Sequence, residues 1–250
     1  MLTKTEQKLI RSLKLKKFRD KEGLFIVEGV KMVEEALSSP FQIREIYLQK
    51  GVLISGLMDA KIISQQEMSE ISHLATPSPA LALVEKSTID LFQTQTIEKI
   101  DKSQLYLGLD AIRDPGNFGT IIRIADWFGI KAIFASHDSV DLYNSKVNQA
   151  SMGAIFRVPV YYVELTEVID TLKIPVWGTA LCGISVYDTQ LSHNGIIIIG
   201  NEANGISDVL QKRFNHTLLI PSFNSDARKS ESLNAAVAAA IICSEFRRRT

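Results

Sequence analysis

Apolar and polar positions in the second part of the chain follow the pattern of a parallel α/β sheet. Short apolar runs are separated by segments whose apolar residues recur every three or four positions, which is the helical period. Ile196–Ile199 is apolar throughout, as expected for a strand covered on both faces. Predicted strands lie near 104–109, 132–135, 158–160, 176–180, 196–199 and 218–220, and predicted helices near 118–128, 145–151, 164–172, 207–213 and 232–249.

The N-terminal part of the chain predicts a smaller α/β unit. Helical spacing covers 2–17 and 31–37. Ser64 stands three residues before Glu67, which is typical of a capping box and predicts a helix over 65–74. Short apolar strands are expected near 24–28, 43–48, 61–63 and 80–84.

A polar, weakly periodic segment separates the two parts. It covers residues 86–103 and predicts a domain boundary. We therefore expect a first domain over 1–90, a linker over 91–103 and a second domain over 104–250. Parallel sheets bind ligands in the loops at the carboxyl ends of their strands, so the second domain is expected to carry the site there.

Composition narrows the class of protein. The chain has 250 residues, of which 46% are hydrophobic, and this supplies enough apolar material for one large or two smaller cores. No uncharged apolar run approaches the roughly 18 residues of a membrane helix, and no signal-peptide pattern opens the chain. Two cysteines exclude a disulfide framework and favour a reducing cytosol. We expect a cytoplasmic protein.

Charge is distributed unevenly. The net charge is zero, yet residues 1–21 contain eight Lys or Arg and only two Asp or Glu. A basic leader on a neutral protein indicates either a polyanionic partner or a solvated helix face, and charge alone leaves both open. The candidate contacts to a polyanion, of which a nucleic acid such as RNA is one example, are Lys14, Lys16, Lys17 and Arg19.

Several common site motifs are missing. The sequence has no phosphate-binding Gly-x-x-x-x-Gly-Lys, no Gly-x-Gly-x-x-Gly after a strand and no Gly-x-Ser-x-Gly. Its four histidines are isolated, which argues against zinc. Asp110 and Asp114 could hold magnesium, but Arg113 and Pro115 favour Asp114 as a turn and helix N-cap. We expect no metal.

Three loops carry unusual chemistry. In the first, Asp114-Pro-Gly-Asn opens a helix that carries Arg123 among apolar residues. A buried arginine needs an anionic partner, and an intramolecular ion pair is the simplest expectation. In the second, Gly200 and Gly205 permit close backbone approach, and Ser207 is expected to cap the next helix.

The third loop leads from Ile220-Pro221 into an alanine-rich helix. Ser232 and Asn234 stand at its start, where ordinary helix caps are also found. The small residues that follow predict close packing against another surface, with a second subunit as one candidate. Residues 222–231 lie between the proline and the serine.

Together and in this order, the loops resemble the SpoU (TrmH-like) RNA ribose 2′-O-methyltransferases of the SPOUT class. The resemblance covers essentially the whole chain. Three of the family's motifs are matched, Asn-x-Gly-x-x-x-Arg-x-Ala, Gly-Asn-Glu-x-x-Gly and Ile-Pro…Ser-Leu-Asn. The matching residues are Asn117, Gly119, Arg123 and Ala125; Gly200, Asn201, Glu202 and Gly205; and Ile220, Pro221, Ser232, Leu233 and Asn234.

The resemblance implies a fold and a chemistry. It implies a parallel-sheet domain with a trefoil knot, preceded by a substrate-binding domain of the ribosomal L30e type, to which Phe25–Leu37 is similar. It also implies methyl transfer from S-adenosylmethionine to a ribose 2′-hydroxyl, in a homodimer joined through the C-terminal domain. The implied catalytic residues are Asn117, Arg123, Glu202, Ser232 and Asn234, and the implied cofactor contacts are Thr179, Ala180, Leu181, Gly200, Ile220 and Leu233.

One departure from the family stands out. The segment 222–231 is longer than usual and lacks the family's glycine, so Asn224 is expected to adopt the left-handed conformation in its place.

Alternative functions follow from the same resemblance. The L30e-like domain favours ribosomal RNA over transfer RNA as the substrate. A binding or ribosome-assembly protein that has lost turnover is the first alternative, and a tRNA ribose methyltransferase is the second. A base methyltransferase is a third and is disfavoured by the pairing of Asn-x-Gly with Ser-Leu-Asn.

Overall fold

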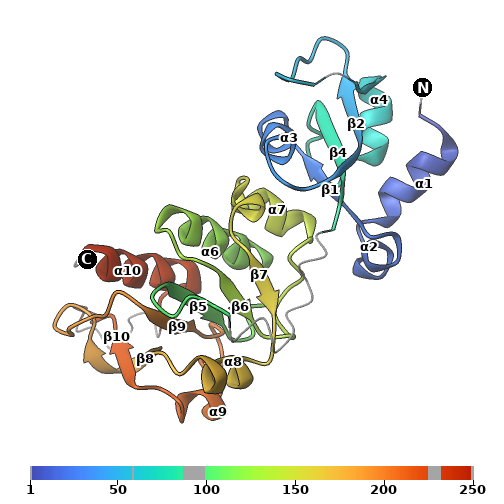
Figure 1. The fold of residues 1–250 in the computed structure, drawn as a ribbon. Helices are drawn as coiled ribbons and strands as arrows, with labels where there is room; N and C mark the ends of the chain where they lie inside the picture. Colours follow the sequence, from blue (N-terminus) through green and yellow to red (C-terminus); the bar gives the residue numbers. More distant parts are fainter. Residues whose placement is uncertain (1, 58, 87–98, 225–231, 249–250) are drawn as a thin grey trace. The chain divides into compact units, whose positions relative to one another are not determined.

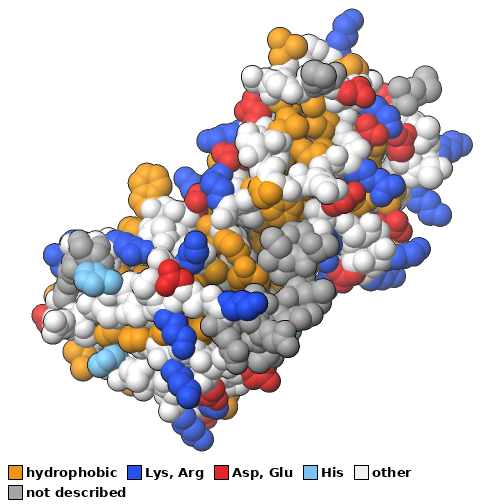
Figure 2. Space-filling model, in the orientation of Figure 1, with side chains coloured by type: hydrophobic (Ala, Val, Ile, Leu, Met, Phe, Trp, Pro, Cys, Tyr) orange, Lys and Arg blue, Asp and Glu red, His pale blue; other side chains and the backbone are white. Residues whose placement is uncertain are grey.

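The computed structural model describes residues 2–57, 59–86, 99–224 and 232–248 (Figure 1). The chain divides into two compact units. Unit 1 contains residues 1–88 and 141–157, and unit 2 contains 89–140 and 158–250. The segment 141–157 therefore packs with the N-terminal part of the chain, although it lies within the range predicted for the second domain. Charged side chains of both signs are spread over the face shown in Figure 2.

Unit 1 is built around a four-stranded sheet in the order β1-β4-β2-β3. Strands β1 and β2 both pair with β4 in antiparallel fashion, and β2 pairs with β3 in parallel. The capping box predicted at Ser64 is confirmed, since its side chain accepts from Glu67 N and Glu67 bonds back. The elements are α1 (Lys4–Ser12), α2 (Lys16–Glu22), β1 (Leu24–Glu28), α3 (Val30–Leu37), β2 (Ile43–Gln49), β3 (Lys61–Ile63), α4 (Gln65–Ile71), β4 (Ala80–Glu85) and α7 (Ser145–Ser151), followed by the short 3-10 helix η2 (Ala154–Phe156).

The single helix predicted over 2–17 is wrong. Two helices occupy this region, because the backbone at Leu15 is extended and Leu13 turns its side chain into the core. The first helix begins with a capping box between Thr3 and Glu6, which satisfies backbone N–H groups that the helix itself leaves unpaired.

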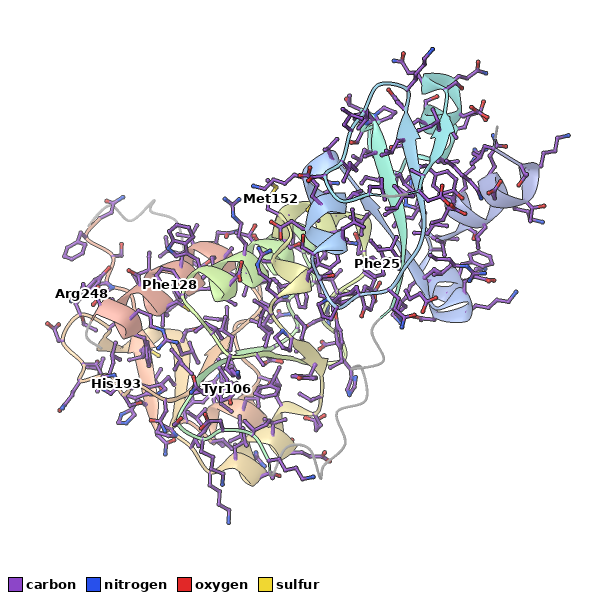
Figure 3. All side chains as sticks on the ribbon, turned by 45° about the horizontal axis from the view of Figure 1, so that its top comes forward. Phe25, Tyr106, Phe128, Met152, His193 and Arg248 are labelled. Carbon is purple, nitrogen blue, oxygen red and sulfur yellow. The ribbon has the colours of Figure 1, made fainter. Side chains whose placement is uncertain are left out.

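Aromatic side chains join 141–157 to the rest of unit 1. The ring centroid of Phe25, a residue labelled in Figure 3, lies 4.6 Å from the ring centroid of Tyr143. The ring of Phe41 lies 5.3 Å from that of Phe156, edge to face. Such pairs stabilise a core beyond the area they bury, so 141–157 contributes to the core of unit 1.

Unit 2 contains a six-stranded sheet in the order β10-β8-β9-β5-β6-β7, and every neighbouring pair is parallel. The predicted α/β class is confirmed. The strands are β5 (Leu105–Leu109), β6 (Ile133–Ala135), β7 (Val160–Tyr162), β8 (Val176–Ser185), β9 (Gly195–Ile199) and β10 (His216–Leu219), and the helices are α6 (Pro115–Trp127), α8 (Leu165–Leu172), α9 (Asp208–Gln211) and α10 (Ala235–Arg248).

Helices cover both faces of this sheet, with α6 and α10 on one side and α8 and α9 on the other (Figure 1). All four isoleucines of β9 are buried, as predicted for a strand covered on both faces. Tyr106, labelled in Figure 3, packs with residues of α8 and α9 in one core cluster. On the other side Arg247 of α10 donates from Nε to the carbonyl of Phe128, at 2.7 Å.

Strand β7 begins two residues later than predicted, at Val160. Pro159 precedes it, and proline has no N–H to donate to a neighbouring strand. Among the described residues, no helix has both the length and the apolar composition of a membrane span.

Candidate functional site

Three loops at the carboxyl ends of strands meet through one hydrogen-bonded network. The amide nitrogen of Asn117, in the first turn of α6, donates to Oε1 of Glu202. The amide nitrogen of Asn234, just before α10, donates to Oδ1 of Asn117 at 2.8 Å. Residues 85 and 117 positions apart in the sequence thus touch directly.

Local sequence fixes the position of Asn117. Asp114 is the N-cap of α6, and its Oδ1 accepts from Asn117 N at 2.8 Å. Pro115 occupies the first turn of α6. Backbone N–H groups there have no acceptor within the helix, so a proline, which has no N–H, loses no hydrogen bond. The predicted N-cap role of Asp114 is confirmed, and Asp114 holds Asn117 at a defined place on the helix.

Asn234 combines two roles. Its Oδ1 accepts from Ala236 N at 3.0 Å and from Val237 N at 3.2 Å, so it caps the N-terminus of α10. Its Nδ2 remains free to reach Asn117. Because the cap holds the oxygen, the nitrogen is directed into the network. Ser232 is exposed and forms no hydrogen bond with the described residues.

The loop that carries Glu202 is held by its own first residues. Asn201 donates from Nδ2 to the carbonyl of Ala111 at 2.9 Å. Its Oδ1 accepts from the backbone of Ala203 at 2.9 Å, and its backbone forms a bridge with Gly205. Sequence reasoning matched Asn201 to a motif but gave it no role, and here it fixes the turn that presents Glu202.

Position 200 requires glycine because the backbone of Gly205 lies where a Cβ atom would be. A Cβ atom on Gly200 would lie 2.5 Å from the carbonyl carbon and oxygen of Gly205. No side chain can be accommodated at that distance, so the turn closes only with glycine at position 200.

Asp110 supports the same loop. Its Oδ2 accepts from Ser207 N at 2.8 Å, and the side chain is 9% exposed. Ser207 occupies the N-cap position of α9, but its side chain makes no capping hydrogen bond, so that prediction is wrong. With Asp110 bound to Ser207 and Asp114 capping α6, both carboxylates have structural roles. The described residues contain no group of three His, Cys, Asp or Glu that could hold a metal ion.

Serines after β6 position the loop that follows β5. The hydroxyl of Ser136 accepts from Ala111 N at 2.8 Å, and Ser139 accepts from Ile112 N at 3.2 Å. Ser136 in turn donates to Asp138 at 2.6 Å, and this bond, with Arg113 nearby, lowers the pKa of Asp138. Sequence reasoning missed these residues; their place directly after a strand was the available signal.

Arg123 lies about 1.7 turns beyond Asn117 on α6 and is exposed. It forms no hydrogen bond or ion pair with any residue that the structure describes, so the expected intramolecular ion pair is wrong. The helical period places it on one face with exposed Thr120 and with Trp127, which is 84% exposed. The guanidinium is therefore available to an external anion.

The predicted cofactor contacts lie within β8, directly after its neighbours β9 and β10, and before α10. The register between β8 and β10 shifts after Gly178, so residues 179–183 of β8 have no paired residue on β10. Thr179 donates to the carbonyl of Ile198 at 3.0 Å, while Leu181 is 70% exposed. Ala180 is exposed beside them, Gly200 follows β9, Ile220 follows β10, and Leu233 is 47% exposed.

Leu181 and Leu233 thus offer apolar surface at these loops. Such surface suits the apolar parts of a nucleoside with an aliphatic sulfonium chain. Asn224 does not have a positive φ; among the described non-glycine residues only Ala111, Met152 and Lys173 do. The prediction for Asn224 is wrong.

A separate cavity lies away from this network. It measures about 690 Å³ and opens at the amino ends of β8 and β10 beside Lys173, Arg213 and His216. Arg213 is bound to Asp170, with Nη2 at 2.8 Å from Oδ2. We place the functional site at the carboxyl ends, because the polar groups there converge.

The predicted RNA contacts separate into two kinds. Lys14, Lys16 and Lys17 are exposed, and Lys16 pairs with Asp20 at 2.7 Å. Arg19 is buried, and its side chain is 4% exposed with Nη2 at 2.6 Å from Oδ2 of Asp141. Its Nη1 donates to two backbone carbonyls. Arg19 is therefore a core residue of unit 1, and its prediction as an RNA contact is wrong.

Two family models match this chain. Residues 104–244 match the SpoU rRNA Methylase family, and residues 5–82 match the MRM3-like substrate binding domain. These ranges lie on either side of the predicted linker.

Similar proteins align along nearly the whole chain. The 23S rRNA (guanosine(2553)-2′-O)-methyltransferase RlmP of Bacillus subtilis (strain 168) is 32% identical, over 95% of this chain and 94% of its own length. A Porphyromonas gingivalis structure assigned to the TrmH family of RNA methyltransferases is 35% identical, with a TM-score of 0.84 and full coverage of both chains. The SpoU methyltransferase AviRb of Streptomyces viridochromogenes, solved with AdoMet, is 25% identical, with a TM-score of 0.84, over 99% of this chain and 98% of its own. The chain thus belongs to the SpoU rRNA methylase family.

Proposed function

We propose that this protein transfers a methyl group from S-adenosylmethionine to a ribose 2′-hydroxyl of structured RNA, with ribosomal RNA as the substrate. The network of Asn117, Glu202 and Asn234 carries the proposal, because it brings the three motif loops to one place. The Bacillus subtilis relative, named as a 23S rRNA methyltransferase, supports ribosomal RNA. The match to a substrate binding domain in unit 1 supports a large structured substrate.

The residues at the strand ends fit the cofactor. Thr179, Ala180 and Leu181 of β8, Gly200 and Ile220 after the neighbouring strands, and Leu233 before α10 would hold it. When bound, S-adenosylmethionine supplies a methyl group on a positively charged sulfur, which is a good leaving group. The C–O bond forms as the C–S bond breaks, S-adenosylhomocysteine leaves, and the hydroxyl proton passes to a base or to solvent. The protein therefore has to orient the ribose hydroxyl in line with that methyl and exclude water that would compete for it.

Arg123 is proposed to grip a phosphate of the target nucleotide. A guanidinium remains protonated in proteins and presents donors in a planar fork, which suits a bidentate grip and not a general base. Asn117 and Asn234 would fix the direction of the Glu202 carboxylate, since each amide is oriented by a hydrogen bond. Ser232, exposed beside Asn234, would complete the contacts to the ribose.

The same proposal includes a homodimer joined through the C-terminal domain, a trefoil knot in unit 2 and a cytoplasmic location. Val237, exposed in the first turn of α10, supports a partner surface. Sedimentation that stays monomeric at all concentrations would contradict the dimer.

The direct test is nucleotide mapping. Ribosomal and transfer RNA from cells with and without the protein are compared for 2′-O-methyl positions, and we expect one ribosomal position to lose its methyl group. A lost position in transfer RNA would favour the tRNA alternative, and a lost base methyl would contradict ribose chemistry. Calorimetry with S-adenosylmethionine distinguishes the remaining alternative, a binding or assembly protein, which would take up no cofactor.

A further inference from the structure

A row of cations lines a groove on helix α1 of unit 1. Lys4, Lys8 and Arg11 follow one another at spacings of four and three residues, which places them on one helix face. With Gln7 and Ser12 they line an open groove of about 590 Å³. Lys and Arg side chains project from the surface over α1 and α2 in Figure 2.

These three cations have no anionic partner among the described residues. Two of the nearby carboxylates are already engaged by other groups. Glu6 accepts from Lys61 at 2.6 Å, and Glu67 accepts from the backbone of Leu2 at 2.7 Å. The hydrogen bonds from Lys61 and Thr3 lower the pKa of Glu6 to about 2, so this carboxylate remains bound to Lys61 at neutral pH. Among the residues that the structure describes, Glu70 accepts only from the neutral amides of Gln7 and Gln66, so it offsets part of the positive charge. The three cations of the groove still leave it with a net positive charge.

The helix that carries the row is fixed to unit 1. Ile10 and Leu13 are buried in the core, and the Thr3–Glu6 capping box fixes its first turn. Its apolar face is thus covered by protein and is not free to enter a lipid surface, as an interfacial helix would require. A rigid row of exposed cations is suited to a polyanion with regularly spaced charges.

We propose that the α1 groove binds the phosphodiester backbone of the substrate RNA through Lys4, Lys8 and Arg11. The proposal rests on the proposed function and assigns it a second RNA contact, separate from the network at Asn117. Contacts to phosphate position an RNA without reading its sequence. The groove therefore contributes affinity and orientation, while the choice of nucleotide is made elsewhere.

The neighbouring helix α2 is less suited to this role. Lys16 is paired with Asp20, and Arg19 is buried against Asp141. Only Lys14 and Lys17 of the predicted RNA contacts remain exposed without an ion pair in the described part of the chain. They lie close in sequence to the end of the α1 row and could extend it.

The test compares two triple variants of the full chain on an unmethylated ribosomal RNA transcript. The groove variant is Lys4→Gln, Lys8→Gln, Arg11→Gln. Its matched control is Lys31→Gln, Arg44→Gln, Lys50→Gln. The control also removes two lysines and one arginine, but from exposed positions of unit 1 outside the groove. Binding is measured by fluorescence anisotropy over a series of salt concentrations.

We expect the groove variant to bind about 10- to 100-fold more weakly at low salt. The slope of log K against log salt should fall by about two to three, because each phosphate contact contributes about 0.7–0.9. The control should retain the wild-type slope. Wild-type binding by the groove variant, or equal losses in both variants, would overturn the proposal. If the groove variant unfolds at a lower temperature, the single Lys8→Glu variant takes its place.

Methyl transfer by the wild-type protein is measured on the same transcript. If the wild type transfers no methyl group but the groove variant still loses RNA affinity, the proposed function is contradicted and RNA binding by the groove is supported. If transfer proceeds and the groove variant binds normally, RNA binding by the groove is contradicted and the proposed function is supported.

Discussion

Asn117 is the one residue of the site that both donates and accepts within the network. Its nitrogen donates to Glu202, and its oxygen accepts from Asn234. An aspartate has the same shape but cannot donate when ionised, and it would place a second carboxylate beside Glu202. The amide is therefore not replaceable by an isostere.

We expect Asn117→Asp to lower kcat/KM by about 10- to 100-fold, since an unpaired acceptor next to a like charge costs about 1–3 kcal/mol. Methyl transfer to ribosomal RNA is the measurement. Asn204→Asp, an exposed position in the Glu202 loop, is the control and should keep full activity. An active Asn117→Asp variant would mean that the network is not used in catalysis.

A substitution at Arg123 is expected to change activity without changing stability. It is exposed and has no described partner, so Arg123→Lys should leave the unfolding temperature unchanged. Turnover should fall at least tenfold, because lysine cannot reproduce a bidentate grip. The control is Arg113→Lys, whose exposed pair with Asp138 contributes little to stability. Near-normal turnover in Arg123→Lys would rule out the grip.

Some side chains could be placed from sequence and others could not. Asp114 was predictable as a helix cap because turn chemistry and the proline after it are local signals. Arg19 was not, because its partner Asp141 lies 122 residues away. Ser207 has the N-cap position, but its side chain makes no capping hydrogen bond, and Leu210 N bonds to its backbone carbonyl instead. Cap propensity alone does not show this.

At the scale of elements, the turn at Gly200–Gly205 joins β9 to the site. Gly200→Ala would bring Cβ to 2.5 Å from the Gly205 backbone, so the turn has to open. We expect binding of S-adenosylmethionine, measured by calorimetry, to weaken at least tenfold. Ala203→Ser changes an exposed residue of the same turn and should bind normally. Unchanged affinity in Gly200→Ala would place the cofactor elsewhere.

Helix α1 is tied to strands β2 and β3 by Lys61, which contacts Glu6 at 2.6 Å and Glu45 at 2.7 Å. The pKa of Glu6 is lowered from 4.5 to about 2, first by the hydrogen bond from Lys61. A lowered folded-state pKa contributes stability that is fully present above about 4.5 and is lost as the pH falls through about 2.

We therefore expect Glu6→Gln to destabilise the protein at pH 7 and to differ progressively less from wild type between pH 4.5 and 2. Urea unfolding at a series of pH values measures the difference. Asp59→Asn, at an exposed position, is the control, and its difference from wild type should not follow this course. A constant difference for Glu6→Gln would show that the Lys61 contact is absent in solution.

Element types were predictable where the hydrophobic period was clear, as in the four isoleucines of β9. Element ends were less so. The break between α1 and α2 depends on Leu13 entering a core formed by distant strands. The displaced segment 179–183 of β8 depends on how β10 pairs beside it. Both are tertiary effects that a local pattern does not contain.

At the scale of the whole molecule, the α/β class was predictable from the alternation of short apolar runs with segments of helical period. The expected position of ligand loops at strand ends followed from that class. The membership of 141–157 in unit 1 was not, because these residues follow a strand of unit 2 without any change in composition. Contacts such as Phe25 with Tyr143 reveal it only once the chain is folded.

We expect a fragment of residues 1–90 to be less stable than the same region in the full chain. It would bury Arg19 without Asp141, and loss of one partner from a buried pair costs about 3–5 kcal/mol. Hydrogen exchange of the β1 and β4 amides measures this. Arg19→Met should restore part of the fragment's protection. Equal protection in fragment and full chain would show that 141–157 is dispensable.

The return of 141–157 to unit 1 also constrains how the protein is made. A nascent chain emerges from the ribosome N-terminus first, and its leading region usually folds as soon as it is complete. Here the leading region is not complete until Arg157 has left the exit tunnel, because Asp141, Tyr143 and Phe156 are still missing. Synthesis of β5, α6 and β6 of unit 2 therefore precedes completion of the N-terminal core.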